Sequence, residues 1–181
     1  AAVSVGRGER LRVAVGAFLG ILVAALLCRA ASMLWGVTPW LMAPLGASAV
    51  LVFAMPASPL AQPWPVLVGN TLSTLFGVLC ASLVSDVALA GALAVSVAIL
   101  VMFATRSLHP PGGAAALLAV IGGATPQFAL FPVASSSLLL LVAGTIYNRL
   151  TRHDYPHRQV RSAVPARSRF TSADLDDALA H

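Results

Sequence analysis

Residues 87–105 read VALAGALAVSVAILVMFAT, a run of 19 residues without a charged side chain. A helix that crosses the hydrocarbon core of a bilayer needs about 20 mainly apolar residues. Similar runs lie on both sides, and between residues 13 and 148 the side chains expected to be ionised are Arg29, Asp86 and Arg106. A typical soluble domain has roughly 25% charged residues, whereas this chain has 9%. The sequence therefore predicts an all-α integral membrane protein.

The apolar sequence divides into six segments. The same length also accommodates four spans and two shorter re-entrant segments, because a full span takes about 17–25 residues. We favour six, with segments two and five as broken helices because proline and glycine interrupt them. The segments are expected over residues 11–35, 38–55, 66–84, 87–105, 106–121 and 130–150.

An internal repeat is visible in the segments that contain these breaks. Residues 44–51, PLGASAVL, match residues 111–118, PGGAAALL, at an offset of 67, and the same offset pairs Pro65 with Pro132. Each unit holds three segments, so an odd number of crossings would invert the second unit relative to the first, as in many secondary transporters. Re-entrant second and fifth segments would instead give a parallel repeat. We favour a 3+3 inverted repeat.

The resulting organisation has three parts. A basic N-terminal flank covers residues 1–10 and a transmembrane domain covers residues 11–150, with repeat one over 11–85 and repeat two over 86–150. A basic tail covers residues 151–181.

The net charge of +5 comes from the two ends, with three arginines within residues 7–12 and six from residue 149 onward. Positive flanks favour the cytoplasmic side, so both termini are expected to be cytoplasmic. Nucleic-acid binding by the tail is disfavoured, because juxtamembrane arginines are an ordinary result of insertion. Residues 171–175, TSADL, resemble a capping box that opens a helix. We expect the tail to be the start of a C-terminal module that has been lost.

The repeated motif suggests a site. Pro44 and Pro111 suit the first position of a helix, where no N–H group is needed, and the residues before them are then expected to be extended. Irregular backbone at membrane depth is tolerated where it is buried in protein or lines a cavity. Helix N-termini offer N–H donors and the positive end of a dipole. Two such ends would meet near the midplane, and no intramembrane carboxylate exists besides Asp86, which lies at a turn. The motif therefore predicts a site for a small anion or a neutral polar solute rather than a cation.

The candidate substrate-binding residues lie in the two motifs. Gly46 and Gly112 would let a ligand approach the backbone, although glycine in membrane helices also serves close packing. Ser48 would add a hydroxyl donor. Arg106 either binds the ligand or extends to the interface, and His109 either bonds the broken backbone or carries a proton. The full candidate set is Pro44, Gly46, Ala47, Ser48, Arg106, His109, Pro110, Pro111, Gly112, Gly113 and Ala114.

Other chemistry is not indicated. Cys28 and Cys80 lie within apolar runs and are interpreted as small buried hydrophobes rather than a disulfide or metal pair. Ser48 and His109 are conceivable neighbours, but no residue pattern orients them as a catalytic pair. We therefore expect no enzyme activity, metal or cofactor. A bundle this small is expected to form a homo-oligomer.

Three motifs in this order, residues 43–51, 58–63 and 105–114, resemble the HPP family of integral membrane proteins, which is named for the His-Pro-Pro run at residues 109–111. The resemblance covers residues 11–156. It implies a four-spanning transporter, and plastid and cyanobacterial members of that family are associated with nitrite. Many bacterial members carry C-terminal CBS domains, which we expect to be missing from this chain. A bacterial inner membrane is the expected location.

The leading hypothesis is therefore membrane transport of a small anion, with nitrite first, through a midplane site made by two half-helix N-termini. The alternative is a membrane anchor or sensor for a C-terminal regulatory module, without transport. An intramembrane enzyme ranks third.

Overall fold

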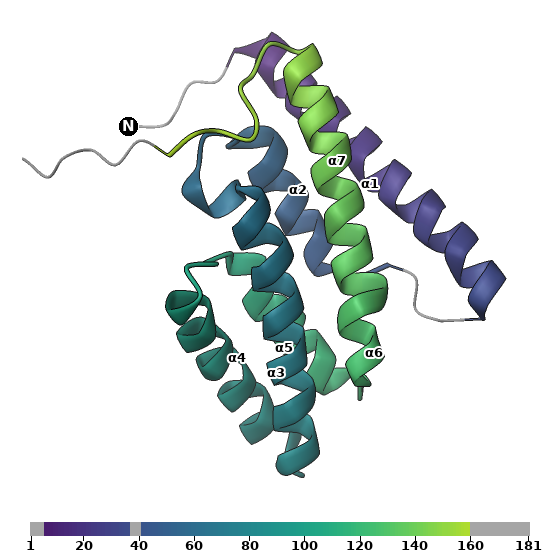
Figure 1. Cartoon of the computed structure of the whole chain (residues 1–181), viewed down its shortest axis with the longest axis vertical. Coiled ribbons are helices and arrows are strands. Elements are labelled where there is room, and N and C mark those ends of the chain that lie inside the picture. The colour runs from purple at the N-terminus through teal and green to yellow at the C-terminus, as the bar shows by residue number, and fades with distance from the viewer. Residues whose placement is uncertain (1–5, 37–40, 160–181) are drawn as a thin grey trace, which may run out of the picture.

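The computed structural model describes residues 6–36 and 41–159 (Figure 1). Every regular element in these two ranges is helical. Two of them, η2 and η3, are short π-helical stretches that contain a proline and continue into α3 and α7. In chain order the elements are α1 (Arg7–Trp35), α2 (Pro44–Ala54), η1 (Pro59–Ala61), η2 (Pro65–Gly69), α3 (Asn70–Leu83), α4 (Val87–Ala104), α5 (Pro110–Ile121), α6 (Pro126–Phe128), η3 (Ala129–Ala134) and α7 (Ser135–Leu150).

Four helical stretches in the described ranges are long and apolar enough to cross a membrane: Arg7–Leu34, Pro65–Leu83, Val87–Ala104 and Pro126–Leu150. The expectation of an all-α membrane protein is confirmed at this level. By contrast, α2 and α5 have 11 and 12 residues. At 1.5 Å per residue each is less than 20 Å long, well short of the ~30 Å hydrocarbon core. Neither can span that core as a helix alone.

Local sequence sets the breaks between these helices. Gly36 ends α1 with a left-handed φ of 66°, and the Asp86 carboxylate accepts the Leu89 amide at 2.8 Å to begin α4. Arg106 follows α4 with φ 53°, a left-handed conformation that glycine usually provides. The amide of Ser107 then donates to the Met102 carbonyl, which closes the helix end.

The prolines of the repeated motif begin the two short helices as expected, with one difference at each. Pro44 is the first residue of α2, but Ala43 before it is already helical at φ −57° and ψ −40°, not extended. α5 begins at Pro110, so Pro111 is its second residue, and His109 before it is extended. The expected extended lead-in is therefore present before α5 but is wrong for Ala43.

The element bounds follow the sequence repeat. Adding 67 to the bounds of α2 and α3 gives 111–121 and 137–150, and α5 and α7 end at these same positions. Both α3 and α7 are preceded by a π-helical stretch. The two halves therefore share a pattern of half-length helix, π-helical turn and long helix.

The helices pack as two groups, with α1 against α2 and α7, and α3 against α4 and α5 (Figure 1). In each group a glycine lets a half-length helix pack closely against a long helix, and the two glycines are 67 residues apart. A Cβ on Gly77 of α3 would meet the backbone of Ala116 in α5. A Cβ on Gly144 of α7 would lie 2.5 Å from Val52 of α2. Each contact needs glycine, because a side chain there would collide with its neighbour.

Cys28 is buried and Cys80 is half-buried, and neither forms a disulfide. The expectations for residues 171–175 and for residues 37–40 lie outside the described residues.

Candidate functional site

His109 lies at the start of α5 and is fully buried. Its Nδ1 is 2.8 Å from the Leu60 carbonyl oxygen, and its Nε2 is 2.8 Å from the Ser48 hydroxyl oxygen. A carbonyl oxygen only accepts, so Nδ1 carries the hydrogen. In the neutral ring Nε2 then accepts, and the Ser48 hydroxyl donates to it. The network thus assigns both the tautomer and the direction of each bond.

The chain of hydrogen bonds continues into two further helices. The Asn70 side-chain amide donates to the Ser48 oxygen at 3.3 Å and to the Ser137 oxygen at 3.2 Å. All three side chains have 0% exposure. Residues from α2, α3, α7 and the start of α5 therefore meet in one polar cluster inside an apolar bundle. We call His109, Ser48, Asn70 and Ser137, together with Ser73, the central cluster.

Two atoms of the central cluster are without a partner. Among the described residues, Asn70 Oδ1 and Ser73 Oγ are the buried side-chain polar atoms that make no hydrogen bond. Leaving such a group unsatisfied costs about 1–3 kcal/mol. Gly112 faces Ser73, since a Cβ there would lie 2.9 Å from the Ser73 oxygen and 2.9 Å from the Gly69 carbonyl. The cluster thus combines a close backbone approach with unsatisfied hydrogen-bonding groups.

The candidate residues from the sequence divide into two sets. Inside the bundle lie Pro44, Ser48, His109, Pro111 and Gly112. The outer set is exposed or half-buried, and consists of Gly46, Ala47, Arg106, Pro110, Gly113 and Ala114. The structure brings the inner set together around the central cluster and does not bring the outer set to it.

The expected supply of unbonded amides at the helix starts is not seen at three positions. The amide of Leu45 donates to Met42 at 3.2 Å, that of Gly46 to Ala43 at 3.1 Å, and that of Gly112 to His109 at 2.8 Å. These three amides are therefore bonded within the chain and are not free for a ligand in this conformation. This differs from the amide-lined site that the helix starts suggested.

Asn70, Ser73 and Ser137 are not in the candidate set that the sequence suggested. A signal was present. Asn70 and Ser137 are 67 residues apart, so they are equivalent positions of the repeat, and both are polar residues at the start of apolar helices. Pairing the polar residues across the repeat would have identified them.

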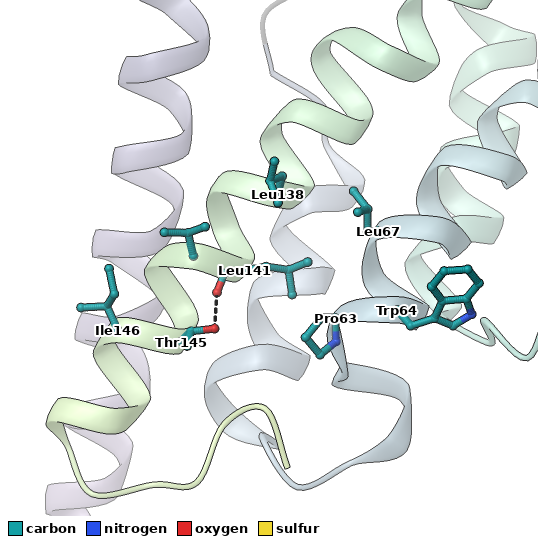
Figure 2. A pocket seen from close by; sticks show the side chains of 8 residues that line it. Pro63, Trp64, Leu67, Leu138, Leu141, Thr145 and Ile146 are labelled. Atoms are coloured by element: carbon teal, nitrogen blue, oxygen red, sulfur yellow. Dashed lines mark hydrogen bonds between the residues drawn. The ribbon is translucent and has the colours of Figure 1, made fainter. Parts of the chain in front are cut away.

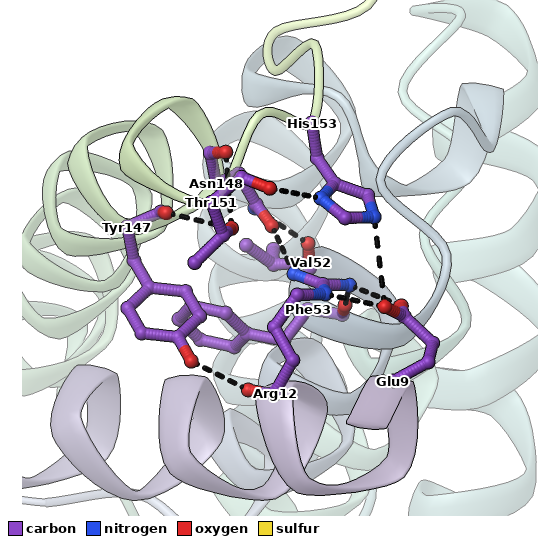
Figure 3. Close-up of polar contacts among 8 residues, drawn as sticks. All are labelled: Glu9, Arg12, Val52, Phe53, Tyr147, Asn148, Thr151 and His153. Carbon is purple, nitrogen blue, oxygen red and sulfur yellow. Dashed lines mark hydrogen bonds and ion pairs between the residues drawn. The ribbon is translucent and has the colours of Figure 1, made fainter. Parts of the chain in front are cut away.

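A second polar cluster lies at the end of the bundle where α1 begins and α7 ends (Figure 3). Arg12 donates to Glu9 at 2.6 Å, to Asn148 Oδ1 at 3.0 Å and to the Phe53 carbonyl at 2.8 Å. Asn148 donates to the Val52 carbonyl at 3.0 Å. The last carbonyls of α2, which have no partner within the helix, are satisfied in this way. We call Glu9, Arg12 and Asn148 the end cluster.

Two surface hollows in the described part of the chain are lined by residues outside the central cluster. A groove of about 560 Å³ lies between η2 and α7, with Trp64, Leu67 and Leu141 among its lining residues (Figure 2). Its one hydroxyl, that of Thr145, donates to the Leu141 carbonyl at 2.7 Å. A second hollow of about 490 Å³ includes Ala43, the residue before α2. The groove suits hydrocarbon, and the second hollow reaches the residue beside a buried proline of the site.

Comparison with known proteins agrees with the membrane architecture. Two transmembrane proteins of Dictyostelium discoideum, DDB_G0273707/DDB_G0273361 and DDB_G0269096, are 40% and 38% identical over 151 residues. The aligned region is 78% of this chain and 48% and 53% of those proteins, so the chain spans about half the length of these relatives. No solved structure matches it significantly. The family model described as "HPP, transmembrane region" matches residues 3–156, and the chain therefore belongs to the HPP transmembrane family.

Proposed function

We propose that this chain carries a small oxyanion across the membrane, with nitrite as the first candidate, and that the permeant passes the central cluster. The observation that carries this proposal is the chain of buried bonds from Leu60 through His109, Ser48 and Asn70 to Ser137. Polar groups inside a membrane protein are costly and mark substrate pathways. The partnerless atoms of Asn70 and Ser73 add groups that a ligand could bind.

We also propose that the two halves form an inverted repeat about this cluster. The residues before α2, Leu41 and Ala43, line a hollow with those after α5, while the start of α5 bonds to Leu60 after α2. The two half-length helices thus run in opposite directions. Asn70 bonds to its own repeat equivalent, Ser137. Such a self-equivalent contact is expected beside a two-fold axis, where the midplane site of an inverted repeat lies.

The proposed orientation places both termini on the cytoplasmic side of a bacterial inner membrane. The beginning of α1 and the end of α7 meet at one end of the bundle, where Arg12 bonds to Asn148. Chain ends on one side require an even number of crossings, and the arginines beside them favour the cytoplasm. A homo-oligomer remains part of this proposal.

The test is nitrite uptake by liposomes that contain the purified protein. We expect initial rates above those of empty liposomes, with competition by formate or nitrate. Rates equal to empty liposomes for nitrite, nitrate, formate and bicarbonate would reject the proposal. Denatured protein reconstituted at the same ratio controls for bilayer leaks.

One observation favours the alternative of an anchor or sensor. Tyr155, after α7, donates to the Ala61 carbonyl at 2.7 Å, and the His157 amide donates to Gln62 at 2.8 Å. The chain after α7 therefore holds the link that supplies the Leu60 carbonyl to His109. A sensor without transport predicts that Ser48→Ala leaves biological function intact in a folded protein.

A further inference from the structure

The Asn70 and Ser73 side chains differ from their neighbours on α3. Thr71 donates to the Leu67 carbonyl at 2.7 Å, and Thr74 donates to the Asn70 carbonyl at 2.8 Å, the usual bond to the residue four positions earlier. Ser73 makes no such bond, and Asn70 Oδ1 has no partner. Residues three apart are neighbours on a helix face. One face of α3 therefore presents two adjacent groups whose hydrogen-bonding capacity is unused.

The hydrogen-bond network decides which Asn70 atom is unused. Ser48 gives its hydrogen to His109, so its oxygen can only accept from Asn70. Turning the Asn70 amide over would place two acceptors, Oδ1 and the Ser48 oxygen, against each other. The partnerless atom is thus the carbonyl oxygen, which requires a hydrogen-bond donor. Ser73, with a hydroxyl, can donate or accept.

The charge around these groups argues against a bare anion. Among the described residues, the buried polar side chains of the bundle interior include no arginine or lysine, and both ring nitrogens of His109 are engaged. Arg106 is exposed. An unpaired ion in such surroundings is strongly disfavoured, and an anion oxygen would also face the Asn70 carbonyl oxygen. A neutral molecule that both donates and accepts would satisfy both groups.

We propose that Asn70 and Ser73 bind the permeant as the neutral conjugate acid of a small oxyacid. The acid O–H donates to Asn70 Oδ1, and the other oxygen of the acid accepts from the Ser73 hydroxyl. The anion takes one proton from solution on the entry side and releases one on the exit side. One anion and one proton cross together, so no net charge moves. This inference rests on the proposed transport function and specifies the permeating species.

The experiment measures nitrite uptake under an imposed membrane potential, set in proteoliposomes by potassium gradients with valinomycin. We expect initial rates, after subtraction of empty liposomes, to be the same at inside-negative, zero and inside-positive potential, and one proton to enter per nitrite as reported by an internal pH dye. Rates that fall at inside-negative potential without proton entry would overturn the inference while leaving transport itself intact. Absence of uptake at every potential would instead reject the proposed function.

Substitutions separate ligand binding from a structural role. Ser73→Ala removes a buried hydroxyl without a partner, so a purely structural residue would tolerate it or become more stable. We expect unchanged or higher thermal stability together with about tenfold slower uptake, the loss of one hydrogen bond to the ligand. Thr71→Val, whose hydroxyl is bonded within α3, is the matched control and should keep the wild-type rate. Equal rates for Ser73→Ala and wild type would contradict the proposed binding role, as would a water molecule found as the sole partner of Asn70 and Ser73 in a nitrite-saturated structure.

Discussion

The central cluster and the end cluster are each built around a fully buried asparagine, Asn70 and Asn148, yet the two asparagines differ in how far their hydrogen-bonding groups are satisfied. In the end cluster Asn148 uses its amide toward Val52 and its oxygen toward Arg12. In the central cluster Asn70 uses only its amide. A fully bonded cluster stabilises one arrangement of helices, whereas a partly bonded one retains capacity for a ligand. The predictions that follow test this distinction.

The largest expected effect on stability is at the end cluster. Arg12→Ala leaves the Phe53 carbonyl, the Asn148 oxygen and the Glu9 carboxylate without this partner. We expect a loss of about 2–3 kcal/mol of stability, measured as a lower melting temperature in detergent. Arg7→Ala, at an exposed position beside it, is the control. An unchanged melting temperature for Arg12→Ala would mean that the end cluster does not hold α1, α2 and α7 together.

A glycine pair from the repeated motifs tests the central cluster. Gly112→Ala places a methyl group 2.9 Å from both Ser73 and the Gly69 carbonyl, whereas Gly46→Ala meets no atom within 4 Å. Overpacking of this kind costs about 1–3 kcal/mol, so we expect Gly112→Ala to slow nitrite uptake at least tenfold and Gly46→Ala to leave it unchanged. The reverse order would place the permeation site on the exposed face of α2.

Arg106 provides a smaller effect of opposite sign. Its backbone is left-handed at φ 53°, which costs about 1 kcal/mol for a residue other than glycine. Arg106→Gly should therefore leave the melting temperature unchanged or raise it, and uptake should stay at the wild-type rate because the side chain is exposed. A loss of uptake in a stable Arg106→Gly protein would return Arg106 to the binding site.

The smallest effect concerns the segment after α7. Burial raises the pKa of the Tyr155 hydroxyl above its usual value near 10. A raised folded-state pKa stabilises the protein below the unfolded value, and this contribution is lost as the pH rises above about 10. Unfolding followed from pH 9 to 11 should show this loss, and Tyr155→Phe should remove it. The same alkaline slope in both proteins would assign it to another group.

The sequence was sufficient for features that depend on composition and local chain stiffness. The apolar runs predicted the four long helices, and proline predicted where α2 and α5 begin. The short length of these two helices was left open, because periodicity and composition do not distinguish a short helix from a span. The contact of Ser48 with His109, across 61 residues, was conceivable from sequence but not assigned.

The part of the site that could not be predicted from the sequence depends on helix packing. Gly46 and Gly112 look alike in sequence, but Gly46 faces outward and Gly112 faces Ser73. The role of Asn70 depends on which of its atoms is already bonded, and this is set by Leu60 and His109 from other parts of the chain. Sequence alone contains the residue types, while their partners follow from the three-dimensional arrangement.

The most direct test of the central claim is ligand protection of a cysteine at Ser48. Ser48→Cys would be introduced in a protein with Cys28→Ser and Cys80→Ala, reconstituted in liposomes and treated with a small charged thiol reagent with and without nitrite. A permeation site at the central cluster predicts slow labelling that nitrite slows further in a concentration-dependent way, while Ser96→Cys on α4 is unaffected by nitrite. Labelling at the same rate with and without nitrite, in protein that still transports nitrite, would contradict the claim that the permeant passes this cluster.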